Sequence, residues 1–204
     1  MRMLPAGRGS LLAEVGSVAE AAALYAAARA ASVDATDIVP AARTVLFDGV
    51  ADLAGLESWL RTVDLNPAPE PPEPSQAGRL VELPTTYDGE DLDDVAGLWG
   101  MTRREAVATH TGVELVVAFC GFAPGFAYCT GLPPELAVPR LESPRPRVPA
   151  GSVGVAGEFT GVYPRSSPGG WRLLGRTAVT LWEPTAEEPA LLAPGTRVRF
   201  VEAP

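Results

Sequence analysis

The sequence predicts an α+β protein made of a small N-terminal α/β sandwich domain and a C-terminal β-barrel or sandwich. Before position 66, apolar residues recur at helical spacing between short strand-like segments, which is typical of a small α/β layer structure. A proline-rich segment follows, and beyond residue 114 short apolar segments alternate with glycine and proline clusters. The 204 residues, of which 47% are hydrophobic, are enough to bury two small cores.

The N-terminal domain is predicted to open with a strand and a helix. Residues 11–16 have the apolar character of a short strand. Ser17 and Glu20 then form an S-x-x-E capping box, and the alanine-rich stretch behind them predicts a helix to about Ala31. Two further strands are expected over 37–39 and 44–47, and a second helix over 53–63.

The domain boundary is predicted at residues 66–75, whose sequence NPAPEPPEPS contains five prolines. Proline removes backbone donors and stiffens a chain toward the extended polyproline II conformation. We therefore assign residues 1–75, with this linker at their end, to the N-terminal domain and residues 76–204 to the C-terminal domain.

The C-terminal domain is predicted to begin with a strand over 80–87 and a helix over 92–98. Thr102 and Glu105 form a T-x-x-E capping box, which predicts a second helix that ends near His110. Strands are then expected at 115–119, 152–156, 179–182 and 197–201.

Composition excludes several classes of partner and site. A net charge of −9 repels phosphate backbones and anionic lipid surfaces, so we expect no nucleic-acid and no membrane partner. No apolar run approaches the roughly 20 residues that span a bilayer, and residues 1–10 lack the apolar core of a secretory signal, so a cytoplasmic location is expected. All 16 basic residues are arginines, which excludes a P-loop lysine and a biotinylated lysine from this chain.

The two cysteines, Cys120 and Cys129, fit neither a redox pair nor a zinc knuckle. We assign them no role and expect no metal site.

Ordered blocks between residues 121 and 177 resemble the small-subunit family of bacterial ATP-dependent 5-oxoprolinases, also known as allophanate hydrolase subunit 1. The blocks are GFAPGF, VPAGSVGVAG, TGVYP, PGGW and GRT. The resemblance implies a small N-terminal α/β domain followed by a cyclophilin-like β-barrel. At Phe159 this sequence departs from the family, which usually has a glutamine before the Thr-Gly pair.

The resemblance also implies an activity. The chain is expected to be one subunit, inactive alone, of an ATP-dependent hydrolase that opens the cyclic amide 5-oxoproline to glutamate. Its expected partners are a larger carboxyltransferase-like subunit of related fold and a third hydrolase component. ATP would be bound by these partners or shared with them, with no covalent biotin on this chain. Two alternatives stay open: a urea carboxylase or allophanate-processing component, and a non-catalytic regulator of a histidine kinase.

His110 is the candidate for proton transfer, because it is the only side chain whose unperturbed pKa lies near neutrality. Near a predicted helix C-terminus, it could equally cap carbonyl groups. Ser152 lies in AGSVG, which does not match the G-x-S-x-G nucleophile elbow, so we expect it to hydrogen-bond a substrate. Gly151 beside it would let backbone N–H groups approach a ligand, or only shape a turn.

Substrate-binding candidates also come from arginines and aromatic residues. A guanidinium suits a carboxylate or phosphate. Of the six arginines between residues 140 and 176 we select Arg140 and Arg176, because they lie in the signature blocks Pro139–Arg140 and GRT. Tyr163 and Trp171 lie beside proline and glycine, where contact with a ligand is expected, whereas barrel core is the default for Phe122 and Phe126. Further candidates within the blocks are the side chain of Thr160 and the backbone of Gly125 and Gly170.

Overall fold

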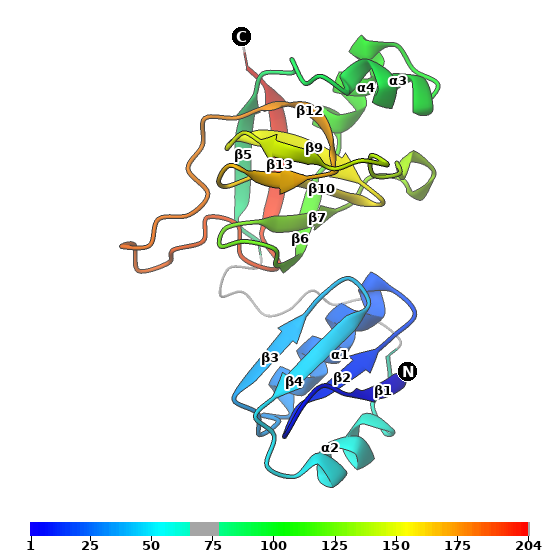
Figure 1. The fold of residues 1–204 in the computed structure, drawn as a ribbon, viewed down its shortest axis with the longest axis vertical. Helices are drawn as coiled ribbons and strands as arrows, with labels where there is room; N and C mark the ends of the chain where they lie inside the picture. Colours follow the sequence, from blue (N-terminus) through cyan, green and yellow to red (C-terminus); the bar gives the residue numbers. More distant parts are fainter. Residues whose placement is uncertain (66–77, 204) are drawn as a thin grey trace. The chain divides into compact units, whose positions relative to one another are not determined.

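The computed structural model describes residues 1–65 and 78–203, so the predicted linker at 66–75 lies outside the described residues. Contacts divide the chain into two compact units, Met1–Glu73 and Pro74–Pro204 (Figure 1). The architecture is α+β, with an antiparallel sheet and two helices in the first unit and a barrel-like sheet in the second.

The first unit is a two-layer α/β structure. Its four-stranded sheet has the order β1-β2-β4-β3, and all neighbouring pairs are antiparallel. The helix α1 packs on β3 and β4 (Figure 1). The elements are β1 (Arg2–Pro5), β2 (Leu11–Glu14), α1 (Val18–Ala30), β3 (Asp37–Pro40), β4 (Thr44–Asp48) and α2 (Leu53–Leu60). The predicted strands and helices are confirmed, while β1 was not predicted.

The start of α1 shows only half of the predicted capping box. The side chain of the N-cap Ser17 accepts a hydrogen bond from the Glu20 backbone N–H at 3.1 Å. The Glu20 carboxylate accepts from the backbone N–H of Gly16 at 2.9 Å, one residue before the N-cap. The helix therefore begins where the sequence predicts, with a shifted reciprocal bond.

The second unit is organised around a seven-stranded sheet with the order β12-β9-β10-β7-β6-β13-β5. Its outer strands meet where Thr86 and Arg176 exchange two backbone hydrogen bonds of 2.9 Å, so the sheet curls into a nearly closed barrel. A two-stranded ribbon of β8 and β11 lies outside this sheet order. The strands are β5 (Leu80–Thr85), β6 (Leu115–Cys120), β7 (Ala127–Thr130), β8 (Arg145–Val148), β9 (Ser152–Ala156), β10 (Phe159–Val162), β11 (Ser167–Gly169), β12 (Arg172–Arg176) and β13 (Arg197–Glu202).

Two helices follow β5. They are α3 (Leu92–Leu98) and α4 (Arg103–Gly112), and a short 3-10 turn, η1 (Pro134–Leu136), follows β7. The capping box of Thr102 and Glu105 is complete at the start of α4, as predicted. The helices pack on one another, α3 against β12 and α4 against β13, and so cover one part of the barrel (Figure 1).

One predicted strand is wrong. Residues 179–182 form no strand, and only an isolated bridge joins Trp182 to Ala190. The apolar pattern that suggested a strand reflects burial of a loop, because Leu181 is 3% exposed and packs into the barrel interior.

Candidate binding site

A tight turn between β6 and β7 forms one side of the candidate site. Phe122 in this turn has a φ of +66°, a left-handed conformation that a bulky side chain rarely adopts. Backbone hydrogen bonds hold the turn closed: Ala123 N–H donates to the Gly121 carbonyl at 2.7 Å, and Phe126 N–H donates to the Ala123 carbonyl at 2.9 Å. The Phe122 side chain is 59% exposed as a result.

An aromatic cluster fills the space below this turn, and its rings come from the β6–β7 hairpin, β10 and the segment before β12. Phe126 is at its centre, with ring centroids 5.3 Å from Tyr163 and 5.2 Å from Trp171, both in edge-to-face geometry. Tyr128 stacks on Phe119 at 4.4 Å. Such pairs stabilise a rigid arrangement. The cluster consists of Phe119, Phe122, Phe126, Tyr128, Phe159, Tyr163 and Trp171.

Arg140 supplies positive charge beside two phenols of the aromatic cluster. Burial raises the pKa of Tyr128 and of Tyr163, and the nearby guanidinium of Arg140 opposes the rise in both pKa values. Both phenols therefore stay protonated at neutral pH and can donate hydrogen bonds. Arg140 is exposed and makes no ion pair with any acidic residue that the structure describes. This side of the barrel can accept an anion.

Two further exposed arginines lie at the β8–β11 ribbon. Arg147 donates through Nε to the Ser166 hydroxyl at 3.2 Å, and Arg165 precedes that serine. Neither has an acidic partner within the described part of the chain.

A buried ion pair fixes the floor of the site. Arg145 donates through Nη2 to both carboxylate oxygens of Asp91, at 2.7 and 2.9 Å, and through Nη1 to the Trp171 carbonyl at 3.3 Å. Asp91 also accepts the backbone N–H of Leu173 at 2.6 Å. Burial alone would lower the pKa of Arg145, but the hydrogen bond and charge of Asp91, with Glu90, outweigh it and raise that pKa. The pair ties the start of α3 to the segment that carries Trp171.

Five of the predicted site residues meet at this place. Tyr163 and Trp171 belong to the aromatic cluster and Gly125 lies in the β6–β7 turn. Arg140 precedes Leu141, whose N–H donates to the Gly170 carbonyl at 2.8 Å. The expected exposure of the aromatic residues is corrected, however. Tyr163 and Trp171 are 2% and 4% exposed, while Phe122, expected in the core, is at the surface. Glycines let the backbone pass close to both buried rings, because a Cβ at Gly169 would lie 2.2 Å from the Tyr163 hydroxyl and a Cβ at Gly161 would lie 3.1 Å from the Trp171 ring.

His110 lies elsewhere, in the last turn of α4 against β13. It is fully buried, its ring lies 4.6 Å from Phe200, and Nδ1 lies 2.6 Å from the Tyr87 hydroxyl. Burial lowers the pKa of His110 to about 3, so the ring is neutral. Its ring contacts, Tyr87 and Phe200, do not belong to the aromatic cluster, and with its burial these features favour a structural role over proton transfer to a dissolved substrate.

The other predicted site residues form the barrel wall. Gly151 donates its N–H to the Tyr163 carbonyl at 2.7 Å, and the Ser152 carbonyl accepts from Tyr163 at 2.9 Å, so both hold the β10 end in place. Ser152 and Thr160 are buried, and the hydroxyl of Thr160 has no hydrogen-bond partner among the described residues. Arg176 is exposed and pairs with Asp88 at 2.9 Å, near the barrel closure.

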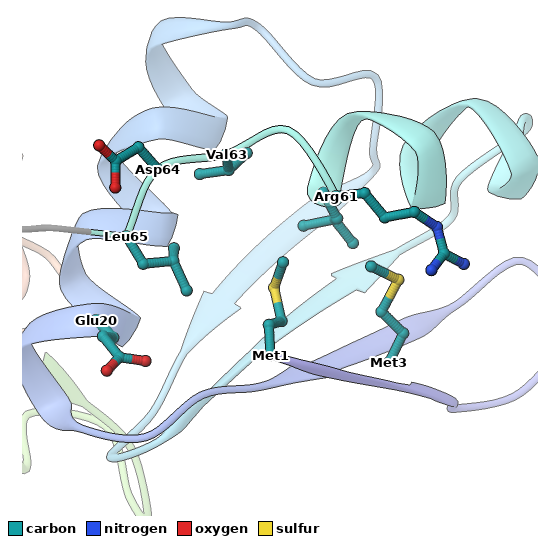
Figure 2. Close-up of a pocket in the computed structure, with 8 residues that line it drawn as sticks. Met1, Met3, Glu20, Arg61, Val63, Asp64 and Leu65 are labelled. Carbon is teal, nitrogen blue, oxygen red and sulfur yellow. The ribbon is translucent and has the colours of Figure 1, made fainter.

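The first unit contains a separate pocket of about 490 Å³. Figure 2 shows the side chains of Met1 and of Met3 in β1 pointing toward the segment that follows α2 and carries Val63 and Leu65, with Glu20 at one end. None of the residues predicted to bind substrate lines this pocket. In residues 1–65 and 78–203 no group of three or more metal-ligating side chains gathers, and no helix is long and apolar enough to cross a membrane.

Comparison with known proteins identifies the family. The carboxyltransferase domain, subdomain C and D, family matches residues 1–192. The chain belongs to this family. Among its relatives, a 5-oxoprolinase subunit of Escherichia coli is 49% identical over 126 residues, which are 60% of this chain and 58% of the relative. The corresponding 5-oxoprolinase subunit of Bacillus subtilis is 48% identical over 126 residues, 60% of this chain and 52% of the relative. The matched region thus spans between half and three-fifths of these relatives.

Solved structures show the same fold. In the crystal structure of TTHA0988, 40% of the chain superposes on 96% of this chain, with a TM-score of 0.75 and 36% identity. The urea amidolyase of Kluyveromyces lactis matches 98% of this chain over 14% of its own length, with a TM-score of 0.73. Its identity of 19% shows a shared carboxyltransferase-domain fold alone.

Sequence reasoning missed the residues that shape the site. Asp91 and Arg145 were not selected, although Asp91 precedes a helix in an acidic stretch, because their contact joins segments 54 residues apart. The exposure of Phe122 also escaped prediction. The available signal was the sequence GFAPGF, whose glycines and proline indicate a turn. Phe122 lies in this turn, outside the alternation of buried and exposed residues along a strand.

Proposed function

We propose that this chain is a subunit of an ATP-dependent 5-oxoprolinase and that the surface beside Arg140 binds the substrate. The observation that carries the proposal is the identity of 44% to 49% with three proteins named as subunits of 5-oxoprolinase. The reaction opens the lactam of 5-oxoproline to give glutamate. The matched region covers part of each relative, so the assignment of the whole reaction to a complex that contains this chain is part of the proposal.

The chemistry of 5-oxoproline suits the surface. The substrate carries one carboxylate and one lactam amide on a small five-membered ring. Arg140 has no acidic partner among the described residues, so a carboxylate can take that place through charge-assisted hydrogen bonds. The phenol of Tyr128 is half-buried and protonated, and it can donate to a second oxygen.

Partner subunits complete the proposed enzyme. ATP would enter as a co-substrate that activates the lactam, and a chain without lysine offers no P-loop for it. We therefore assign ATP binding to the partners or to a shared surface. The partners are a larger carboxyltransferase-like subunit of related fold and a third hydrolase component. A cytoplasmic location, where ATP is available, belongs to the same proposal.

The test is reconstitution. The chain is co-expressed with the products of its neighbouring genes, and ATP-dependent glutamate release from L-5-oxoproline is measured with the full set and with each component omitted. The proposal predicts activity that disappears when this chain is left out. ATP turnover with urea or allophanate, but none with 5-oxoproline, would replace it with the carboxylase-related function. Binding to a histidine kinase without turnover would support the regulatory alternative instead.

A further inference from the structure

Phe122 occupies a backbone conformation that its side chain disfavours. Among the described residues, only Phe122 and Ser32 are non-glycine residues with positive φ, at +66° and +49°. The turn that contains Phe122 requires this conformation, because the hydrogen bond from the Ala123 N–H to the Gly121 carbonyl spans the residue. Glycine would satisfy the turn without strain. The phenylalanine side chain is therefore not explained by the turn itself.

Burial does not explain the side chain either. Phe122 is 59% exposed, the most exposed of the large hydrophobic residues that the structure describes. Its ring centroid lies 5.3 Å from that of Phe126 and 6.3 Å from that of Tyr163, and the rings of both pairs are near perpendicular. Strained residues that persist in a rigid frame concentrate at ligand clamps. Exposure and strain at one aromatic residue thus point to a partner that the ring contacts.

The position of the ring indicates which partner. The segments that carry Phe122 and Arg140 meet at the aromatic cluster. The Phe122 ring lies 5.3 Å from Phe126, which lies 5.2 Å from Trp171, and the N–H of Leu141, next to Arg140, donates to the carbonyl of Gly170, next to Trp171, at 2.8 Å. A ligand that paired its anionic group with Arg140 would bring its apolar carbons toward Phe122. We infer that the Phe122 ring packs on the ring of a small cyclic carboxylate whose carboxylate group pairs with Arg140. This inference rests on the proposed function and names the residue that would select a cyclic substrate.

A second exposed aromatic residue defines the rival explanation. Trp182 is 38% exposed, and it packs at Gly125 in the same turn. If both rings served to dock a protein subunit, loss of either would weaken assembly of the complex. The ring of Phe122 contacts Phe126 and Tyr163, whereas Trp182 has no ring contact with the aromatic cluster within the described residues, which favours the ligand for Phe122.

The first experiment compares variants in the assembled complex. Phe122→Gly removes the ring and relieves the strain, Phe122→Tyr keeps a ring, and Ser32→Gly relieves strain in the other unit as a matched control. We expect Phe122→Gly to raise KM for L-5-oxoproline about 10-fold, the size of one aromatic contact, with kcat nearly unchanged. Its melting temperature should stay level or rise, Phe122→Tyr should restore KM to within about twofold, and Ser32→Gly should leave KM unchanged.

Two results would overturn the inference in these variants. One is a Phe122→Gly complex with the KM of the unmodified protein. The other is loss of subunit association in both Phe122→Gly and Trp182→Ala. That result would show that the two rings dock a protein subunit.

A second readout is independent of turnover. Fluorophenylalanine is placed at position 122 of the intact complex, and its ¹⁹F resonance is followed during addition of L-5-oxoproline, with L-glutamate as the acyclic comparison. We expect a shift with the cyclic compound only. A shift without glutamate release would keep the inference and reject the proposed reaction, whereas a silent resonance at saturating L-5-oxoproline would reject the inference even in an active enzyme.

Discussion

The Tyr87 hydroxyl lies 2.6 Å from Nδ1 of His110, and Nε2 of the same ring is buried without a partner among the described residues. Burial, with the negative charge of Glu202, raises the pKa of Tyr87 far above neutrality, so the Tyr87 hydroxyl stays protonated and forms a hydrogen bond with Nδ1. The chain's only histidine therefore joins α4 to the barrel as a neutral group.

This neutral histidine makes stability depend on pH. The pKa of His110 is about 3 in the folded chain, against an ordinary value of 6.5, so below pH 6.5 the unfolded chain binds the extra proton. Stability is thus complete above pH 6.5 and falls as the pH drops toward 3, by up to about 1.4 kcal/mol per unit. Urea unfolding at pH 6.5 and 5 should show this loss, and His110→Gln should flatten it. Equal pH dependence in both proteins would contradict the assignment.

The buried ion pair of Asp91 and Arg145 predicts a large cost when one partner is removed. Asp91→Asn removes the carboxylate that accepts from Arg145 and from the Leu173 N–H, while Glu90 still pairs with Arg145 at 2.6 Å, so we expect a loss of about 2 to 3 kcal/mol in the free energy of unfolding. The control is Asp93→Asn, since Asp93 is 74% exposed in its pair with Arg103 and should cost less than about 1 kcal/mol. Urea unfolding of both variants measures the two losses in the free energy of unfolding. Equal losses in Asp91→Asn and Asp93→Asn would contradict the prediction that the buried pair contributes more.

Gly151 is predicted to be structural in the barrel wall. Its φ is +80°, and a Cβ would lie 2.3 Å from the Thr177 carbonyl oxygen, so Gly151→Ala combines strain with a backbone clash. We expect a loss of about 3 kcal/mol or more. Gly157 is the matched control, because its φ is +57° with open space around the Cβ position, and alanine there should cost about 1 kcal/mol. Thermal unfolding of the two variants would measure this difference, which vanishes if Gly151 only serves a ligand.

Local signals predicted most of the fold. Capping residues fixed the starts of α1 and α4, and apolar spacing located the strands of the first unit, because these features act over a few residues. The loop around Leu181 was predicted as a strand, since burial against a barrel and burial in a sheet leave the same apolar pattern.

The site was less predictable because it depends on distant contacts. The sequence indicated Arg140, Tyr163 and Trp171, and the structure brings them together. It did not indicate that both aromatic rings are buried, because the rings that pack on them, Phe126 of the β6–β7 turn and Tyr128 of β7, are distant in the sequence. Nor did it indicate burial of His110, since a helix C-terminus can face either solvent or core.

The central claim is that Arg140 of this chain holds the substrate carboxylate in the assembled enzyme. The most direct test is the KM for L-5-oxoproline in complexes that contain Arg140→Ala or the control Arg104→Ala, an exposed arginine of α4. Loss of a charge-assisted hydrogen bond predicts a KM raised roughly 10- to 100-fold in Arg140→Ala, with kcat within about twofold and the control unchanged. A KM for Arg140→Ala equal to that of Arg104→Ala would contradict the claim.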